Sequence, residues 1–238
     1  MPYLLDNRLA PLTFSWSFLQ APLDRVLRSY TRWQRVILHR VRAADVDRDL
    51  EQSLGLLEPL DMSCSRVLFQ ATRSEWTSVF GNSALGGRPP VAAYMAERLE
   101  CRAVDCVAIP NSASRRRGNA QPSRGVWGAV ELTLHAPHRV GSTNRERTIR
   151  VANDVRGWEF QLLGAQQPFE EASFYDAPRK ADRFTTEMLE RYCRALGLDI
   201  FDAAFYSGPG VITQSTPWLL PRSASMSLGE ARVRLGMD

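Results

Sequence analysis

Three consecutive segments in the second half of the chain alternate polar and apolar residues, and this alternation restricts the fold more than any other feature. The segments are WGAVELTLHA, RTIRVAND and WEFQLLG, at residues 127–136, 147–154 and 158–164. A period of two places alternate side chains on opposite faces of a strand. Asn153, Asp154 and Gly157 are turn formers between the last two segments, where we expect a hairpin with about five connecting residues. The pattern predicts an antiparallel meander.

Shorter apolar segments surround this meander and predict the rest of the fold. Residues 66–72 and 75–80 are rich in β-forming side chains and are expected to be two short strands. Residues 104–110 have few polar interruptions, which is typical of a strand in the interior of a sheet. Helices are predicted over residues 90–99 and 185–196, the second capped by its first threonine. The sequence therefore indicates an α+β fold, with an antiparallel meander sheet packed against several helices in a single domain spanning residues 1–238.

The two ends of the chain are expected to be less regular than its middle. Residues 1–21 are apolar and aromatic but are broken by prolines, which predicts an extended arm packed on the domain. Residues 207–238 contain further prolines and glycines, and the sequence leaves open whether this tail is docked or loose. Within the tail, Ser227 and Glu230 have the spacing of a helix capping box. No secretory signal is evident, so the cytoplasm is the expected location.

An unusually basic segment, RVLRSYTRWQRVILHRVR, occupies residues 25–42 and contains no acidic residue. At about 100° per residue, a helix over the whole segment places six of its seven basic side chains on one arc. Like charges three or four positions apart repel each other weakly. The arc therefore indicates either a solvated helix face or a contact surface for an anionic partner. Its members are Arg25, Arg28, Arg32, Arg35, His39 and Arg42.

Two further charged groups are candidates for the same partner surface. The loop over residues 111–125 is small, polar and rich in arginine, so it is expected to be either a charged hairpin loop or a second phosphate-contacting element. A mixed cluster precedes the last predicted helix and is expected to be an ion-pair patch or a surface complementary to a partner. The candidate residues are Arg115, Arg116 and Arg117 in the loop, and Glu170, Glu171 and Arg183 in the cluster.

The composition argues against several classes of function. A net charge of +4 is too small for a protein that coats nucleic acid. The four cysteines lack the paired spacing of a zinc site, and no run of residues is long and apolar enough to span a membrane. His135 and His138 form an HxxH pair around a proline, without the further ligands that a metal site needs. Cys64 is a conceivable nucleophile but is expected to be a buried thiol. No cofactor and no catalytic motif are indicated.

Four longer stretches carry a resemblance to known proteins. They are YLLDNRLAPLTFSWSFLQAPLD, SEWTSVFGN, RVANDVRGWEFQLLGAQQPFEE and DRFTTEMLERYCRALGLDIFDAAFY, which together resemble uncharacterised bacterial cytoplasmic proteins of similar length. The combination of a meander ending in a WxF strand with a short acidic and aromatic helix is also similar to bacterial toxin immunity proteins. That resemblance implies a protein that binds and occludes a cognate toxin without turnover.

The sequence therefore favours a non-enzymatic protein-binding protein, with an immunity protein as the most specific form of this prediction. Nucleic-acid binding through residues 25–42 and the arginine loop is the alternative, since arginine also matches phosphate well. An enzyme with an unfamiliar site is the third possibility, and a pocket that gathers carboxylates or histidines would support it.

Overall fold

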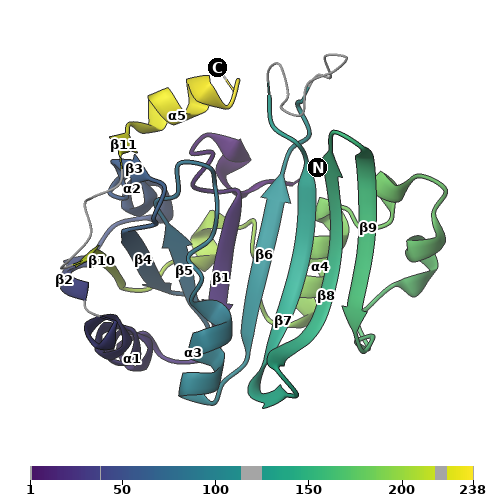
Figure 1. The fold of residues 1–238 in the computed structure, drawn as a ribbon. Coiled ribbons are helices and arrows are strands. Elements are labelled where there is room, and N and C mark those ends of the chain that lie inside the picture. The colour runs from purple at the N-terminus through teal and green to yellow at the C-terminus, as the bar shows by residue number, and fades with distance from the viewer. Residues whose placement is uncertain (1, 38, 114–124, 218–223, 238) are drawn as a thin grey trace.

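The computed structural model describes residues 2–37, 39–113, 125–217 and 224–237. Nine strands of this part of the chain form one sheet, in the order β2-β10-β4-β5-β1-β6-β7-β8-β9 (Figure 1). Every pair of neighbouring strands is antiparallel. The strands are β1 (Ser15–Leu19), β2 (His39–Val46), β4 (Arg66–Ala71), β5 (Thr77–Gly81), β6 (Ala103–Ile109), β7 (Ala129–Val140), β8 (Thr143–Asp154), β9 (Gly157–Gly164) and β10 (Gly210–Pro217).

Five α-helices and four short 3-10 helices of the described residues complete the α+β fold that the sequence predicts. The α-helices are α1 (Leu23–Val36), α2 (Leu50–Gly55), α3 (Ala92–Leu99), α4 (Thr186–Ala195) and α5 (Leu228–Arg234). The 3-10 helices are η1 (Leu4–Asn7), η2 (Ala172–Asp176), η3 (Lys180–Asp182) and η4 (Ala203–Phe205), and a separate two-stranded ladder joins β3 (Leu60–Asp61) to β11 (Ser225–Met226).

The predicted meander is confirmed, because β6, β7, β8 and β9 are consecutive neighbours in the sheet. The predicted strands at β4 and β5 and the helices α3 and α4 are also present. The expected five-residue connection before β9 is wrong, since Asp154 pairs directly with Gly157 and leaves a two-residue turn. The carboxylate of Asp154 accepts hydrogen bonds from the backbone N–H groups of Arg156 and Gly157, which closes the turn locally.

Residues 1–21 do not form the expected extended arm, because they contain a strand in the interior of the sheet. β1 pairs with β5 on one side and β6 on the other. Its side chains alternate: Trp16 and Phe18 are fully buried on one face, while Ser17 and Leu19 are buried on the other. A strand with neighbours on both edges and cover on both faces explains why this segment is so apolar.

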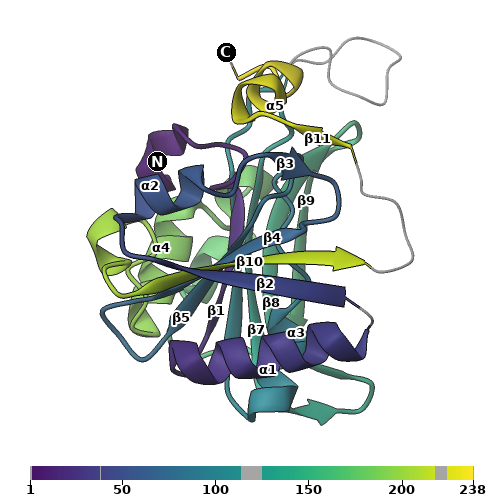
Figure 2. The ribbon, with the colours of Figure 1, turned by 90° about the vertical axis from the view of Figure 1, so that its left-hand side faces the viewer.

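The C-terminal segment also belongs to the sheet. β10 lies between β2 and β4, so the described part of the tail is docked by backbone hydrogen bonds on both edges (Figure 2). Farther on, the predicted capping box is confirmed: Ser227 accepts a hydrogen bond from the backbone of Glu230, and the Glu230 side chain accepts one from the backbone of Ser227. The sequence could not show the pairing because β2 and β4 are distant in the chain.

Helices cover the two faces of the sheet unequally. On one face α2 and α4 pack over a core in which the ring of Phe80 lies 6.3 Å from that of Trp16 and 5.6 Å from that of Tyr206. On the other face α1 and α3 cover the strands on the β2 side, where the rings of Tyr30 and Phe69 are 4.8 Å apart. No described helix lies over β9 on this second face (Figure 1). The meander therefore presents a partly open surface beside α3.

The docking of β10 generates a test by truncation. A chain that stops after Ser207 loses β10, which leaves β2 without a described neighbour and exposes the backbone edge of β4. We expect this chain to lose its cooperative thermal transition, measured by circular dichroism. A chain that stops after Ala224 keeps β10 and should still unfold cooperatively. Equal transitions in the two truncated chains would contradict the assigned role of β10.

Candidate functional site

The basic segment at residues 25–42 is divided between two elements, so the prediction of one continuous helix is wrong. α1 ends at Val36, and His39 and Arg42 lie in strand β2. β-Branched side chains at Val36 and Ile37 weaken a helix at this point, and all of β2 pairs with β10. Four of the six predicted residues therefore remain on the helix. His39 and Arg42 are separated from them by a change of backbone direction.

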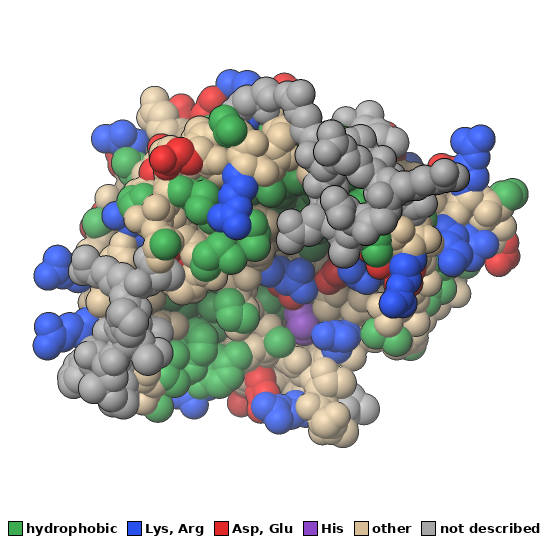
Figure 3. Space-filling view, turned by 45° about the horizontal axis from the view of Figure 1, so that its top comes forward, with side chains coloured by type: hydrophobic (Ala, Val, Ile, Leu, Met, Phe, Trp, Pro, Cys, Tyr) green, Lys and Arg blue, Asp and Glu red, His purple; other side chains and the backbone are tan. Residues whose placement is uncertain are grey.

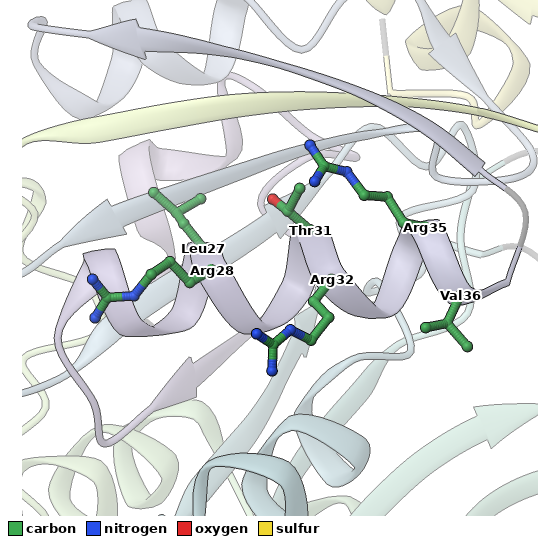
Figure 4. Close-up of a pocket in the computed structure, with 6 residues that line it drawn as sticks. All are labelled: Leu27, Arg28, Thr31, Arg32, Arg35 and Val36. Carbon is green, nitrogen blue, oxygen red and sulfur yellow. The ribbon is translucent and has the colours of Figure 1, made fainter.

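The arginines that remain on α1 differ in their partners. Arg28 forms an ion pair of 2.8 Å with Asp24, one turn earlier, and its side chain is still 76% exposed. Arg25 donates a hydrogen bond of 2.8 Å to the carbonyl oxygen of Leu99, at the end of α3. Arg32 and Arg35 are exposed and have no acidic partner among the described residues. The exposed face of α1 thus carries positive charge that the described residues around it only partly neutralise. Figure 4 shows Arg28, Arg32 and Arg35 extending from this helix.

Two shallow hollows flank these side chains and bring a further arginine to them. The smaller, of 280 Å³, lies between α1 and α3 and adds Arg98 to the arginines of α1. The larger, of 630 Å³, runs along α1 and has aliphatic side chains at its edge. Val36 is 73% exposed and Ile37, next to it, is 42% exposed. We call Arg25, Arg28, Arg32, Arg35 and Arg98, together with Val36 and Ile37, the α1 surface.

Many exposed arginines elsewhere in the described structure are paired with acids. The pairs Arg8–Glu51, Arg139–Glu97 and Arg191–Glu171 have N–O distances of 2.7–2.8 Å, and Arg194 pairs with both Glu190 and Asp199. These positive charges are therefore balanced locally. The α1 surface instead gathers five arginines, of which only Arg28 forms an ion pair with an acid among the described residues, and it also exposes aliphatic side chains. This combination is found at contact surfaces.

Glu170 was expected on a partner surface, but the structure places it in the interior. Its carboxylate forms two hydrogen bonds with the guanidinium of Arg147, at 2.8 and 2.6 Å, and the two side chains are 0% and 5% exposed. Tyr175 donates a third hydrogen bond to the same carboxylate. Because both side chains have lost contact with solvent, the pair depends on hydrogen bonds of good geometry to replace its hydration. It fixes the segment after β9 against β8.

Glu171 and Arg183 remain at the surface, each with an intramolecular partner. The guanidinium of Arg191 binds both carboxylate oxygens of Glu171 at 2.7 and 2.8 Å, and these hydrogen bonds lower the pKa of Glu171. The guanidinium of Arg183 lies over the ring of Phe160 and donates to the carbonyl of Ala177. Both residues belong to the β9 side of the sheet, whereas α1 packs beside β2 at the other edge. Arg115, Arg116 and Arg117 lie outside the described residues.

A polar network that sequence reasoning missed lies on the face of the sheet beside α3. Its centre is Asp105 of β6, which is 5% exposed. One carboxylate oxygen accepts a hydrogen bond of 2.6 Å from the hydroxyl of Ser17. The other oxygen lies 2.9 Å from Nε2 of His135 and 3.1 Å from Nε of Arg88. The network therefore ties β1, β6, β7 and the segment before α3 to one buried carboxylate.

A second carboxylate extends this network toward solvent. Oε1 of Glu131 lies 3.2 Å from Nη2 of Arg88, and Oε2 lies 3.4 Å from Nε of Arg150. The hydroxyl of Thr133 donates to Glu131 and is 2.9 Å from the hydroxyl of Thr148. We call Ser17, Arg88, Asp105, Glu131, His135 and Arg150 the Asp105 network. In Figure 3 basic and acidic side chains lie beside a histidine in a hollow of the surface, the combination of side-chain types that the Asp105 network contains.

The network stabilises the ionised form of its central carboxylate. Burial by itself raises the pKa of Asp105, but the hydrogen bond from His135 and the charge of Arg88 outweigh burial and hold this pKa below its ordinary value. The available signal in the sequence was weak: Asp105 is a single acid within an apolar strand, and Glu131, Thr133 and His135 form the polar half of an alternating strand. Neither pattern identifies the partner strand.

The other candidate groups for chemistry are not assembled into a site. His135 is buried in the Asp105 network while His138 is exposed, so the HxxH pair is not brought to one place. The described residues contain no group of three or more histidine, cysteine or acidic side chains suited to a metal ion. Burial raises the pKa of Cys64 to about 11, which opposes formation of the nucleophilic thiolate at neutral pH.

Comparison with known proteins identifies no relative. No family model, no curated protein and no solved structure matches this chain. Among the described residues, no helix has both the length and the apolar character needed to cross a bilayer. The α1 surface and the Asp105 network must therefore be interpreted from their own physical properties.

The contrast between Glu170 and Glu171 predicts very different effects for the same substitution. Glu170→Ala leaves the Arg147 guanidinium buried without its carboxylate, so we expect the free energy of unfolding to fall by about 3 kcal/mol. Glu171→Ala removes only an exposed ion pair, so it should lower the free energy of unfolding by less than about 1 kcal/mol. Urea denaturation of both variants measures the difference. Similar values for the two would contradict the assignment of Glu170 to the interior.

The low pKa of Asp105 predicts a pH-dependent contribution to stability. In Asp105→Asn an amide N–H group faces the donors of Arg88 or His135. We therefore expect the free energy of unfolding to fall by about 3 kcal/mol at pH 7. Because the folded-state pKa lies below the unfolded value of about 3.9, the carboxylate contributes fully above that pH and less as the pH falls through its folded-state pKa.

The difference in unfolding free energy between Asp105→Asn and the unsubstituted protein should therefore shrink in acid. Denaturation curves at neutral pH and below pH about 4 measure it. The control is Asp176→Asn, at an exposed residue. Its free energy of unfolding should stay within about 0.5 kcal/mol of that of the unsubstituted protein. A difference that grows in acid would reverse the assigned direction of the Asp105 pKa.

Proposed function

We propose that this chain is a non-enzymatic binding protein that holds an acidic protein surface through its α1 surface. The observation that supports this proposal is the exposure of Arg32 and Arg35 without acidic partners, in a protein whose other surface arginines are often paired. Arginine forks bind carboxylates in pairs of hydrogen bonds. An acidic partner would supply the counter-charges that the neighbouring residues do not.

The exposed aliphatic side chains favour a protein over a small anion as this partner. Val36 and Ile37 lie at the end of α1, beside the hollow lined by Arg32 and Arg35. Protein interfaces combine apolar contact with arginine anchors, and the apolar part contributes by excluding water. A small anion would use the charges but would leave these aliphatic side chains exposed.

The most specific form of the proposal is an immunity protein that acts in the cytoplasm by occluding a cognate bacterial toxin. Its support is the resemblance of the meander, the WxF strand and the acidic and aromatic helix to such proteins. Occlusion requires a stable surface and no catalytic group, which agrees with the use of a rigid helix on a large sheet. In this account the α1 surface would cover acidic groups on the toxin.

Charge reversal on the α1 surface tests the proposal. The unsubstituted protein should restore growth to cells that express a toxin encoded beside its gene, and should co-elute with that toxin. The double variant R32E/R35E should bind the toxin at least about tenfold more weakly and protect poorly, because each glutamate faces acidic groups across the contact. Growth assays and titration calorimetry with the purified toxin measure the two effects.

The matched control is R156E/R179E, which reverses two exposed arginines on the β9 side of the molecule. Each substitution of arginine by glutamate lowers the net charge by two, so either double variant lowers it from +4 to 0. The control should bind and protect like the unsubstituted protein. Full protection by R32E/R35E would remove the α1 surface from this account, and no protection against any neighbouring toxin would remove the immunity function.

Nucleic acid is the other anionic partner that the α1 surface could contact. Arg25, Arg28, Arg32 and Arg98 line one hollow, and such a group of guanidinium donors also suits phosphate. A mobility shift with RNA or DNA at low salt, with an affinity that falls by roughly one power of salt concentration per phosphate contacted, would favour this alternative. Absence of any shift would leave the acidic protein surface as the partner.

A further inference from the structure

The Asp105 network has more hydrogen-bond donors than its own acceptors use. Asp105 accepts from Ser17, His135 and Arg88, and Glu131 accepts from Arg88, Arg150 and Thr133. A carboxylate has about four acceptor positions, so both acids are close to saturated. Any additional contact to this network must therefore use its remaining donors.

Those donors belong to two guanidinium groups that are only partly buried. Arg88 uses Nε and Nη2, which leaves Nη1 without a partner among the described residues. Arg150 contacts Glu131 through Nε alone, which leaves both of its terminal nitrogens. The two side chains are 30% and 41% exposed, so their outer N–H groups can reach a dissolved molecule. Because both bind the carboxylate of Glu131, one additional oxyanion can reach both.

A buried nitrogen supplies an independent sign that the network is incomplete. Nδ1 of His135 is inaccessible to solvent and has no hydrogen-bond partner among the described residues, while Nε2 of the same ring is bound to Asp105. Unpaired buried nitrogens are rare because each loses its hydration without replacement. Because Nε2 donates to Asp105, Nδ1 of a neutral ring is an acceptor, so a hydroxyl group of a ligand or a water would complete it, and not the oxyanion itself.

The electrostatic balance identifies the kind of ligand. Two arginines and two carboxylates give these four groups no net charge, and each carboxylate is already neutralised by a guanidinium. A cationic ligand would meet saturated acids and exposed guanidinium groups, which repel it. A carboxylate or phosphate group would meet free, charge-assisted donors held in place by Glu131. The partial exposure of Arg88 and Arg150 gives such a ligand access.

We propose that the exposed side of the Asp105 network is a binding site for a small oxyanion, a carboxylate or phosphate group held between Arg88 and Arg150, with Glu131 fixing both guanidinium groups. The site does not depend on the α1 surface, which lies over the strands on the β2 side of the sheet. Thr133 and His135 lie along β7 beyond Glu131 and would face the rest of the ligand. The chemistry of recognition is the same for a carboxylate and a phosphate.

Titration with two simple probes tests the site on the intact protein. Inorganic phosphate and malonate are added to about 10 mM, with binding followed by calorimetry and by the nitrogen resonances of His135 and Arg150. Arg150→Gln should weaken binding by about tenfold, because it removes charge-assisted donors from a partly exposed residue without stranding a buried charge. Arg145→Gln is the matched control: it lies exposed on the same strand and should bind like the unsubstituted protein.

The outcomes separate the possible occupants. Binding of phosphate alone assigns a phosphate-bearing ligand, and binding of malonate alone assigns a carboxylate; either result supports the site if Arg150→Gln loses it and Arg145→Gln keeps it. The His135 resonance should move on binding because its ring shares Asp105 with Arg88. Absence of heat and of any resonance shift with both probes would mean that only water completes the network, and would overturn the proposal. Equal binding by Arg150→Gln would also overturn it.

Discussion

The pairing of β1 with both β5 and β6 is the constraint on which the rest of the molecule depends. The strands β2, β10, β4 and β5 lie on one side of β1 and the meander from β6 to β9 lies on the other. The central strand therefore joins two halves that would otherwise have separate edges. Its side chains also join two layers, because Trp16 and Phe18 enter the core beneath α4 while Leu19 enters the core beneath α1 and α3.

The same strand explains how a charged network can be buried on one face of the sheet. Ser17 is directly opposite Asp105, and its hydroxyl provides one of the three donors to that carboxylate. A buried carboxylate is costly unless it is paired and hydrogen-bonded. Three donors from β1, β7 and the segment before α3 meet this requirement. The adjoining Glu131 repeats the arrangement closer to solvent, where its two arginines retain unused N–H groups.

Charge has two different roles in this protein, and burial separates them. The pair of Arg147 and Glu170 is enclosed and fixes one segment, so its effect is on folding. The arginines of α1 are exposed and contribute little to the stability of the domain, and we propose that their unbalanced charge serves contact with another molecule. A count of charged residues cannot distinguish these roles, because burial depends on which distant side chains each charged group meets in the folded chain.

The sequence by itself determined the elements with a regular local pattern. Alternation predicted β7, β8 and β9, and capping residues predicted α4 and α5, because strand periodicity and helix capping depend on neighbouring residues. The tertiary structure decided where the helix at residue 25 ends, where residues 1–21 pair and whether the tail is docked. It also decided which charges are buried: Asp105 needs Ser17 and His135, and Glu170 needs Arg147. These outcomes depend on strands and side chains far apart in the chain, so no local pattern could reveal them.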